Sequence, residues 1–339
     1  MSDWLSHKEV LFHRYAQNPI LRASDWPYLV DSVFNPGAAL LPDGTTVLLC
    51  RAEDHRGISH LSVARSPNGV DGWVIDPQPT FFPQPERYPE EIWGVEDPRI
   101  TYLPELEQYA IVYTAYSRAG PGISLAMTRD FRTFERYGMI VAPIAKDAAL
   151  LPRRIDGRWA LVHRPMRQNG KTSTGWFTRR PLELPDAHIW VSFSSDLRQW
   201  HDHRLILHAR EGPWWDSNKI GLTAPLIETA EGWLMLYHGV RQTASGNIYR
   251  TGLALFDPNM RRCDLRGDQW MLGPEQPYER VGDVGNVVFP CGYTLAPDGD
   301  AFALYYGAAD TCIGLATGSV LSLLDWLHRH GQPSVPLKH

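Results

Sequence analysis

The sequence contains few cysteines, and their spacing argues against several kinds of site. Only four are present among 339 residues, Cys50, Cys263, Cys291 and Cys312, and no two of them form a C-x-x-C pair. This distribution gives little support to a structural zinc site, and no metal site is expected. It is typical of reduced, mostly buried thiols in a cytosolic protein.

Long apolar runs are also missing. No stretch of about eighteen apolar residues occurs, so a membrane span is not expected. The opening segment MSDWLSHKEVLFHRY has neither an apolar core nor a small-residue cleavage site. We therefore expect no signal peptide and a cytoplasmic location.

An excess of positive charge is absent as well. Lys and Arg total 33 against 38 Asp and Glu, which gives a formal net charge of -5 at pH 7. A basic face for a nucleic-acid backbone is therefore not expected. With 43% hydrophobic residues the chain can bury a large core. No linker divides it, so residues 1–339 are predicted to form one domain; the oligomeric state, a homo-oligomer included, is left open.

Aromatic residues, glycine and proline are abundant instead. The chain has 13 Trp, 14 Tyr, 28 Gly and 27 Pro, a composition that favours many short strands separated by turns. Helical periodicity is confined to the C-terminus. There Val320, Leu323, Leu324 and Leu327 share one face, between a capping Ser319 and the helix-stopping residues at 331 and 333. We predict a helix over about 319–330 that packs on the outside of the last repeat.

Strand-like runs recur five times along the chain. They begin near residues 46, 109, 158, 232 and 301, and each is followed by a second run that ends in small polar residues. The spacing of 49 to 74 residues is longer than the roughly 40–45 of a WD40 blade, so these units carry longer insertions. The pattern favours an all-β, five-bladed β-propeller. A β-sandwich is the alternative.

Charged residues occupy similar places in the first run of several units. Arg51, Arg164 and His238 lie near the ends of three of them, and Asp310 follows the fifth. In a propeller the ends of the innermost strands surround a central pocket, so these side chains are predicted to meet near the axis. Arginine, with Lys or His as further donors, binds phosphate without a glycine-rich loop. Strand-end charge left in solvent is the alternative.

The stretch EIWGVEDPRI, residues 91–100, places Trp93, Glu96, Asp97 and Arg99 close together. Asp-Pro favours turns and charged residues favour water, so a surface turn is one interpretation. A carbohydrate site is the other, with Trp93 stacked on a sugar and a carboxylate that transfers a proton. The stretch alone does not decide between them.

Eight segments, taken together and in order, resemble the mannoside phosphorylases of glycoside hydrolase family 130. They are FNPGAALLPDGTTVLLCRAED, GVEDPRITYL, KDAALLPRRIDGRWALVHRP, WDSNKIG, GWLMLYHGV, NIYRTGLALFD, NVVFPCGY and YYGAADTCIGLA. The resemblance extends from about residue 18 to residue 327. It implies a five-bladed propeller that cleaves β-mannosides with inorganic phosphate and yields α-mannose 1-phosphate with inversion. Phosphate is then a co-substrate, and no cofactor is implied.

The resemblance also implies roles for individual residues. Asp97 is similar to the family's general acid, which is thought to act through the 3-hydroxyl of the sugar. An inverting phosphorylase needs only one such carboxylate, because phosphate itself is the nucleophile. The implied phosphate contacts are Lys146, Arg164, His238 and Tyr249. The implied contacts to the mannosyl unit are Asn35, Arg51 and Asp310, and Pro36 stands where some relatives have Ser.

Other residues of these motifs have weaker expectations. Lys219 is as consistent with a structural role as with phosphate binding. Glu96 and Arg99 are expected to pair and hold their loop, and His163 is expected to point into its blade. The polar segment 166–180 is expected at the rim of the pocket or as a solvated insertion.

Two alternative functions follow from the same residues. Some family members are β-mannosidases that have lost phosphate-binding residues, but Lys146, Arg164 and His238 are all present here and favour phosphorolysis. The second alternative is a non-catalytic carbohydrate-binding propeller, which would need neither an acid nor a cluster of cations.

Overall fold

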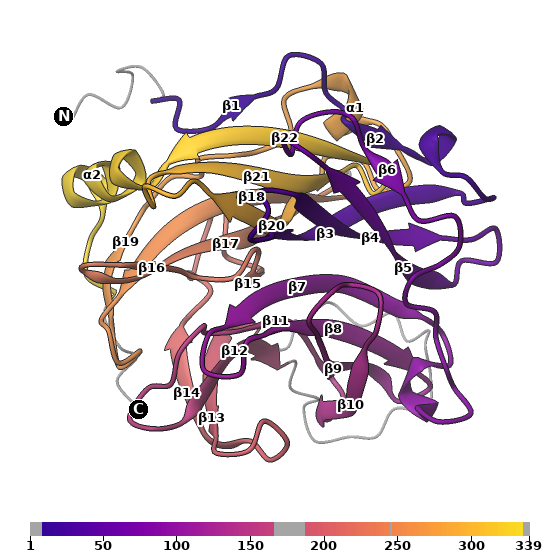
Figure 1. The fold of residues 1–339 in the computed structure, drawn as a ribbon. Helices are drawn as coiled ribbons and strands as arrows, with labels where there is room; N and C mark the ends of the chain where they lie inside the picture. Colours follow the sequence, from indigo (N-terminus) through magenta and orange to yellow (C-terminus); the bar gives the residue numbers. More distant parts are fainter. Residues whose placement is uncertain (1–8, 166–186, 245, 335–339) are drawn as a thin grey trace.

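The computed structural model describes residues 9–165, 187–244 and 246–334, which are mainly β-strands. Five antiparallel sheets follow one another as the blades of a propeller (Figure 1), which confirms the predicted fold. Blade 1 contains β3 (Ser32–Leu40), β4 (Thr46–Glu53), β5 (Ser59–Ser66) and β6 (Val74–Ile75), and blade 2 contains β7 (Val95–Leu103), β8 (Gln108–Ser117), β9 (Gly120–Thr128) and β10 (Glu135–Val141). Blade 3 contains β11 (Ala145–Leu150), β12 (Trp159–Pro165), β13 (Ile189–Ser194) and β14 (His201–Leu207). Blade 4 contains β15 (Lys219–Leu222), β16 (Ile227–Thr229), β17 (Gly232–Thr243), β18 (Gly246–Phe256) and β19 (Cys263–Arg266), and blade 5 contains β20 (Val288–Leu295), β21 (Ala301–Ala308) and β22 (Cys312–Ser319).

The start of the chain completes the last blade. Strands β1 (His13–Arg14) and β2 (Leu21–Arg22) both pair with β22, so indigo and yellow strands lie side by side in Figure 1. Arg14 Nε also donates a hydrogen bond of 2.7 Å to Glu279 Oε1 in the short helix α1 (Pro277–Arg280). Strand pairing and the ion pairs of Arg14 with Glu275 and Glu279 thus attach the N-terminal segment to β22 and to the region of α1.

The core consists of apolar layers between neighbouring blades. In β4, for example, Val47 and Leu49 pack toward blade 2, whereas Leu48 and Cys50 pack toward blade 5. Because side chains alternate along a strand, both faces of each sheet are buried. This explains why the strands read as nearly continuous apolar runs.

The C-terminal helix agrees with its prediction. Helix α2 (Val320–His330) begins at Ser319, whose hydroxyl accepts a hydrogen bond from the Ser322 amide, and it ends at Gly331. Its apolar face packs on the layer between blades 4 and 5. All four cysteines are buried free thiols, as expected. Within the described ranges no helix is long and apolar enough to cross a membrane.

The innermost strands are not those expected from the sequence. The runs near residues 46, 109, 158, 232 and 301 form β4, β8, β12, β17 and β21, which are the second strands of their blades. The innermost strands are β3, β7, β11, β15 and β20, which contact one another around the axis. They were missed because proline, glycine and charged residues interrupt their apolar pattern.

These interruptions are β-bulges that serve the central cavity. The pairing register shifts between Phe34 and Gly37, between Glu96 and Arg99, and again in β11. Asn35, Asp97 and Asp147 lie within these bulges with φ of 45°, 48° and 55°, a left-handed conformation that Asn and Asp tolerate better than most residues. A bulge re-aims its side chain, and these three side chains all line the cavity described next.

Candidate active site

A cavity of about 190 Å³ lies at the starts of the innermost strands, and all five blades contribute to it. All eight residues singled out from the sequence line it. The complete lining consists of Asn35, Arg51, Asp97, Lys146, Asp147, Arg164, Lys219, His238, Tyr249, Val284, Val287, Phe289 and Asp310. The structure thus brings the expected residues together.

Asp97 is fixed through one of its two oxygens. Its Oδ1 accepts hydrogen bonds from Asn35 Nδ2 at 2.9 Å and from Arg51 Nη1 at 3.1 Å. In the described part of the chain its Oδ2 takes part in no hydrogen bond. The side chain is therefore held in place while one oxygen stays available to a ligand.

The two carboxyl groups Asp97 and Asp310 differ in protonation. Burial opposes the ionisation of Asp97, but Arg51 and Lys146 outweigh it and hold its pKa below the ordinary value. For Asp310, burial raises the pKa to about 6, although Arg51 opposes this shift. At neutral pH, Asp97 is a carboxylate before ligand binds, and Asp310 is close to its titration point. A pair of carboxyl groups whose pKa values are shifted in opposite directions is typical of acid–base sites.

The opposite side of the cavity is dominated by cations. Arg164 is buried, and its Nε and Nη2 lie 2.8 Å and 2.7 Å from Asp147 Oδ2. Lys146, on the neighbouring strand, makes no hydrogen bond or ion pair with any described residue. Burial disfavours its charge, but Asp147, Glu96 and Asp97 outweigh this and raise its pKa. Lys146 is therefore a cation available to an anionic ligand.

Lys219 extends this group of cations from blade 4. Its Nζ donates a hydrogen bond of 2.8 Å to the hydroxyl of Tyr249. Burial and the nearby charge of Arg164 lower the Lys219 pKa to about 8. Its position beside Tyr249 in the cavity favours ligand binding over a purely structural role.

His238 is a polar donor rather than a cation. It is fully buried, packs on Phe289 with ring centroids 4.9 Å apart, and its Nε2 lies 3.6 Å from Asp147 Oδ2. Burial lowers its pKa to about 3, so the ring is neutral at physiological pH. It can donate one hydrogen bond to an anion but brings no charge.

The prediction that Glu96 and Arg99 pair with each other is wrong. Arg99 crosses the axis instead: its Nε donates to the Thr223 carbonyl at 2.6 Å, and its Nη2 donates to the Leu222 carbonyl at 3.1 Å. Glu96 Oε1 lies 3.4 Å from Arg51 Nη2. The β7 bulge between residues 96 and 99 sends the two side chains to different partners.

Three further expectations can be compared with the structure. His163 points into its blade as expected, with Nε2 2.6 Å from Ser192 Oγ. Trp93 is 39% exposed and packs against Tyr116, so it is not a core residue. The segment 166–180 lies outside the described residues.

Asp147 is the charged residue of the cavity lining that the sequence analysis missed, along with the apolar Val284, Val287 and Phe289. Its signal was the alignment of three bulge sequences, N-P-G at 35–37, D-P-R at 97–99 and D-A-A at 147–149. In each, an Asn or Asp stands at the same place in consecutive blades. KDAALLP instead suggested only Lys146, because an acid is not expected among phosphate-binding cations.

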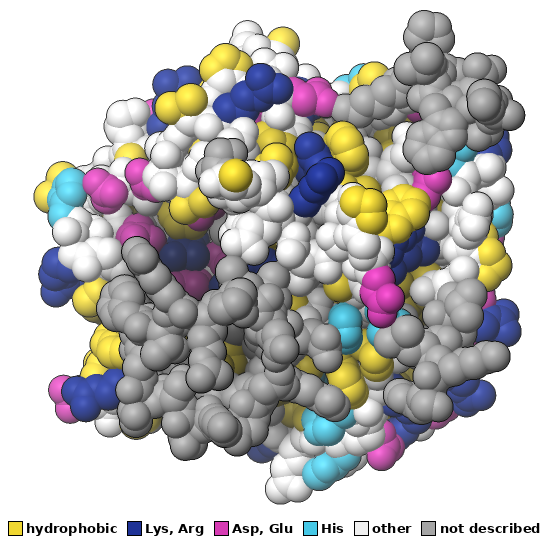
Figure 2. All heavy atoms as spheres, turned by 180° about the vertical axis from the view of Figure 1, so that it is seen from behind, with side chains coloured by type: hydrophobic (Ala, Val, Ile, Leu, Met, Phe, Trp, Pro, Cys, Tyr) yellow, Lys and Arg dark blue, Asp and Glu magenta, His cyan; other side chains and the backbone are white. Residues whose placement is uncertain are grey.

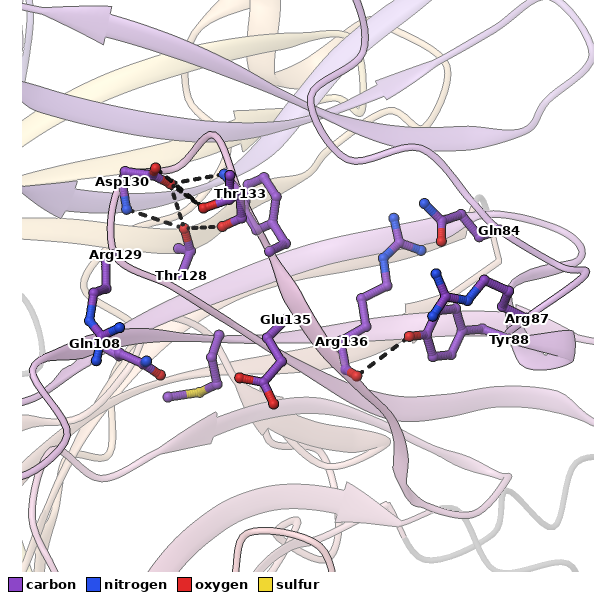
Figure 3. Close-up of a pocket in the computed structure, with 12 residues that line it drawn as sticks. Gln84, Arg87, Tyr88, Gln108, Thr128, Arg129, Asp130, Thr133, Glu135 and Arg136 are labelled. Carbon is purple, nitrogen blue, oxygen red and sulfur yellow. Dashed lines mark hydrogen bonds between the residues drawn. The ribbon is translucent and has the colours of Figure 1, made fainter.

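A second hollow, of about 750 Å³, lies along blade 2 (Figure 3). Part of its polar lining is a turn, in which Thr128 Oγ1 and the Thr133 amide both donate to Asp130 Oδ1. The same turn recurs in blades 1 and 3, where Ser66 donates to Asn68 and Ser194 donates to Asp196. A turn repeated between blades is a structural element, so this hollow is not the candidate site.

The face seen in Figure 2 carries interspersed acidic and basic side chains rather than a continuous basic field. Within residues 9–165, 187–244 and 246–334, no three His, Cys, Asp or Glu residues are grouped to hold a metal ion.

The fold and the cavity define a carbohydrate-active β-propeller in which an acid shares a pocket with a group of cations. Residues 12–329 match the model of glycoside hydrolase family 130, described as beta-1,4-mannooligosaccharide phosphorylase, and the chain belongs to this family.

Similar proteins match over nearly the whole propeller. The beta-1,4-mannooligosaccharide phosphorylase of Ruminococcus albus is 32% identical over 331 residues, which cover 95% of this chain and 92% of the relative. The 1,2-beta-oligomannan phosphorylase of Thermoanaerobacter sp. is 32% identical over 92% of this chain and 95% of its own. The structure of beta-1,2-mannobiose phosphorylase from Listeria innocua, in complex with beta-1,2-mannobiose, has a TM-score of 0.81 at 27% identity, over 94% of this chain and 99% of that one.

Proposed function

We propose that the protein cleaves β-mannosides with inorganic phosphate and releases α-D-mannose 1-phosphate and a free sugar. The observation that carries this proposal is the division of one cavity between two groups of side chains. Blades 5, 1 and 2 supply Asp310, Asn35, Arg51 and Asp97, whereas blades 3 and 4 supply three further cations, Lys146, Arg164 and Lys219. The mannosyl unit then lies against the first group, and phosphate lies against the second.

On the phosphate side, Arg164 supplies a planar fork and Lys146 supplies a point charge, which together suit the oxygens of a phosphate dianion. Lys219 adds charge, while Tyr249 and His238 add neutral donors. In this arrangement phosphate reaches the sugar from the side opposite the leaving group. The proposed reaction therefore inverts the anomeric carbon.

The leaving sugar takes its proton from Asp97, which is protonated in the phosphate complex, and hydrogen phosphate afterwards replaces that proton. A phosphate oxygen bonds to the anomeric carbon as the glycosidic bond breaks, and Asp97 protonates the leaving oxygen through the 3-hydroxyl of the mannosyl unit. The new phosphate ester still carries its own proton, and it returns this proton to Asp97. Atoms and charge balance without water.

Phosphate binding also prepares Asp97 to act as an acid. Before ligand binds, Arg51 and Lys146 favour the ionised form of this side chain. A dianion beside Lys146 offsets part of this cationic field, so the Asp97 pKa rises in the complex. Phosphate binding thereby favours the protonated form of Asp97 that the reaction requires.

Hydrolysis is less well supported by the same residues. An inverting hydrolase needs a second carboxylate that activates water. On the cation side of the cavity, Asp147 is fully buried and bonded to Arg164, so it is poorly placed as a base. The intact set of cations further supports phosphate as the nucleophile.

An assay with and without phosphate tests the proposal. β-1,4- and β-1,2-mannobiose are both supplied, because relatives are named for both linkages. We expect mannose 1-phosphate to form only when phosphate is present. Free mannose formed at the same rate without phosphate would identify a hydrolase, and binding without turnover would identify a non-catalytic propeller.

We further propose that the chain forms one catalytic domain and that it acts in the cytoplasm. Its four buried free thiols fit the second proposal, because the cytoplasm is a reducing compartment.

A further inference from the structure

We propose that Asp147 is a positioning residue that holds the Arg164 guanidinium in place before phosphate binds. This inference rests on the proposed function, in which Arg164 contacts phosphate. Asp147 takes no part in the chemistry of that proposal. It acts through its neighbour.

The contact between the two side chains fixes the orientation of the Arg164 guanidinium. Arg164 Nε and Nη2 both point at one oxygen, Asp147 Oδ2, at 2.8 Å and 2.7 Å. The two side chains are 2% and 1% exposed, so water does not compete for the contact. Within the described residues Arg164 donates no other hydrogen bond. Its remaining N–H groups are therefore free for a ligand in the cavity that it lines.

A carboxylate is unexpected in an anion site, and this makes the positioning role testable. By Coulomb's law alone the charge of Asp147 repels phosphate. Burial opposes its ionisation, yet Arg164, Arg99 and Lys146 keep its pKa well below the ordinary value. The negative charge is therefore present whenever phosphate binds. Its benefit is to keep a flexible arginine in the orientation that binds phosphate.

The backbone around Asp147 holds it firmly. Asp147 lies in the β11 bulge with a φ of 55°, which directs its side chain to the axis. Gly221 allows the close approach of the facing strand, because a Cβ there would lie 2.5 Å from Asp147 Oδ2 and 2.5 Å from His238 Cε1. Asp147 is therefore held by its own strand and by the strand across from it.

Replacement of Asp147 by Asn tests the proposal. Asn keeps the size of the side chain but loses the charge that orients Arg164. We expect the dissociation constant of inorganic phosphate, measured by calorimetry without mannoside, to rise about tenfold or more. The KM for the mannoside should change far less. Electrostatics alone predicts the opposite sign, because a repulsive charge has been removed.

Asp216→Asn is the matched control. Asp216 is equally buried and bonds to Arg266 Nη2 at 2.6 Å, but it does not line the cavity. This variant should lose thermal stability and bind phosphate like the wild type. If Asp147→Asn binds phosphate as tightly as the wild type, or more tightly, the proposal is overturned.

A measurement on the wild type keeps the proposal testable if Asp147→Asn does not fold. In NMR spectra of arginine side chains without phosphate, the Nε–H signal of Arg164, assigned by its loss in Arg164→Lys, should be protected from exchange. A rapidly exchanging signal would contradict the proposal. Neither readout involves turnover. A wild-type enzyme that binds phosphate but makes no mannose 1-phosphate would therefore overturn the proposed function and not this inference.

Discussion

Asp147 and Asp216 are both fully buried and both bind arginine, but of these two only Asp147 lines the cavity. In the wall of blade 4, Asp216 Oδ2 accepts hydrogen bonds from Arg210, Arg266 and the Tyr237 hydroxyl. The arginines also donate to backbone, Arg266 to the His208 carbonyl and Arg210 to the Gly267 carbonyl. We call Asp216, Arg210, Arg266 and Tyr237 the sealed cluster.

The open cluster consists of Asp147 and Arg164. Here Arg164 Nε and Nη2 lie 2.8 Å and 2.7 Å from one carboxylate oxygen, and Arg99 Nη2 lies 3.6 Å from the other. Within the described residues Arg164 donates no hydrogen bond to any other residue. The two clusters share residue types and burial, so neither property distinguishes them. The difference lies in the donors that remain: all three nitrogens of Arg266 donate within the wall of blade 4, whereas among the described residues Arg164 donates only to Asp147 and lines the cavity.

The largest expected effect is at Asp97, which shares the cavity with the open cluster. Asn keeps the size of Asp97 and its contact with Arg51 but has no proton to transfer. General acid catalysis contributes about 10² to 10⁴-fold, so turnover of an unactivated β-mannoside should fall by roughly that factor. Initial rates at saturating phosphate measure this. A rate within a few-fold of the wild type would exclude Asp97 as the acid.

Arg266→Ala should break the sealed cluster and affect stability instead. It leaves the Asp216 charge buried with fewer partners, and removing one member of a buried pair costs about 3–5 kcal/mol. Urea unfolding measures the loss in the free energy of unfolding. The KM for phosphate should stay near the wild-type value under conditions where the variant is folded. A large rise in this KM without a loss of stability would show that the two clusters are not distinct.

Arg164→Ala should break the open cluster and affect phosphate binding. A charge-assisted hydrogen bond lost from a buried site costs roughly 1.5–3 kcal/mol, or about ten- to a hundredfold in affinity. Phosphate titrations at fixed mannoside, and the reverse titrations, separate the two substrates. The account is wrong for this residue if mannoside affinity falls while the dependence on phosphate is unchanged.

The smallest effect concerns Lys219, beside the open cluster. Its pKa is lowered to about 8, so it is a cation below that pH and becomes neutral above it. Phosphate affinity should therefore fall a few-fold as the pH rises from neutral to well above 8. Lys219→Arg is the matched variant, because arginine stays charged and should remove this step. The same pH profile in both proteins would assign the step to another group.

The sequence was sufficient to predict the fold because the propeller repeats. The second strands were recognised from their apolar runs and preceding turns, and α2 from its periodicity and the Ser319 cap. The innermost strands were not recognised, because a bulge breaks the alternation that marks a strand. Asn35 and Asp97 could be placed in the cavity only through family motifs that include those bulges.

Contacts across the axis could not be predicted from sequence. Arg99 on blade 2 bonds to carbonyls of blade 4, more than a hundred residues away, and no local pattern encodes that partner. Asp147 was missed although its partner Arg164 lies in the next strand of the same blade, because the sequence does not show that the two side chains meet. The sequence shows which residues are present, but only the folded propeller shows which of them are in contact.

The central claim is that an acid and a phosphate site face each other across one mannosyl unit. Proton NMR of a single turnover in phosphate buffer tests it most directly, because the anomeric signal reports both the nucleophile and the side of attack. We predict α-mannose 1-phosphate as the first product. A β-configured phosphate, or free mannose as the main product at saturating phosphate, would contradict the account.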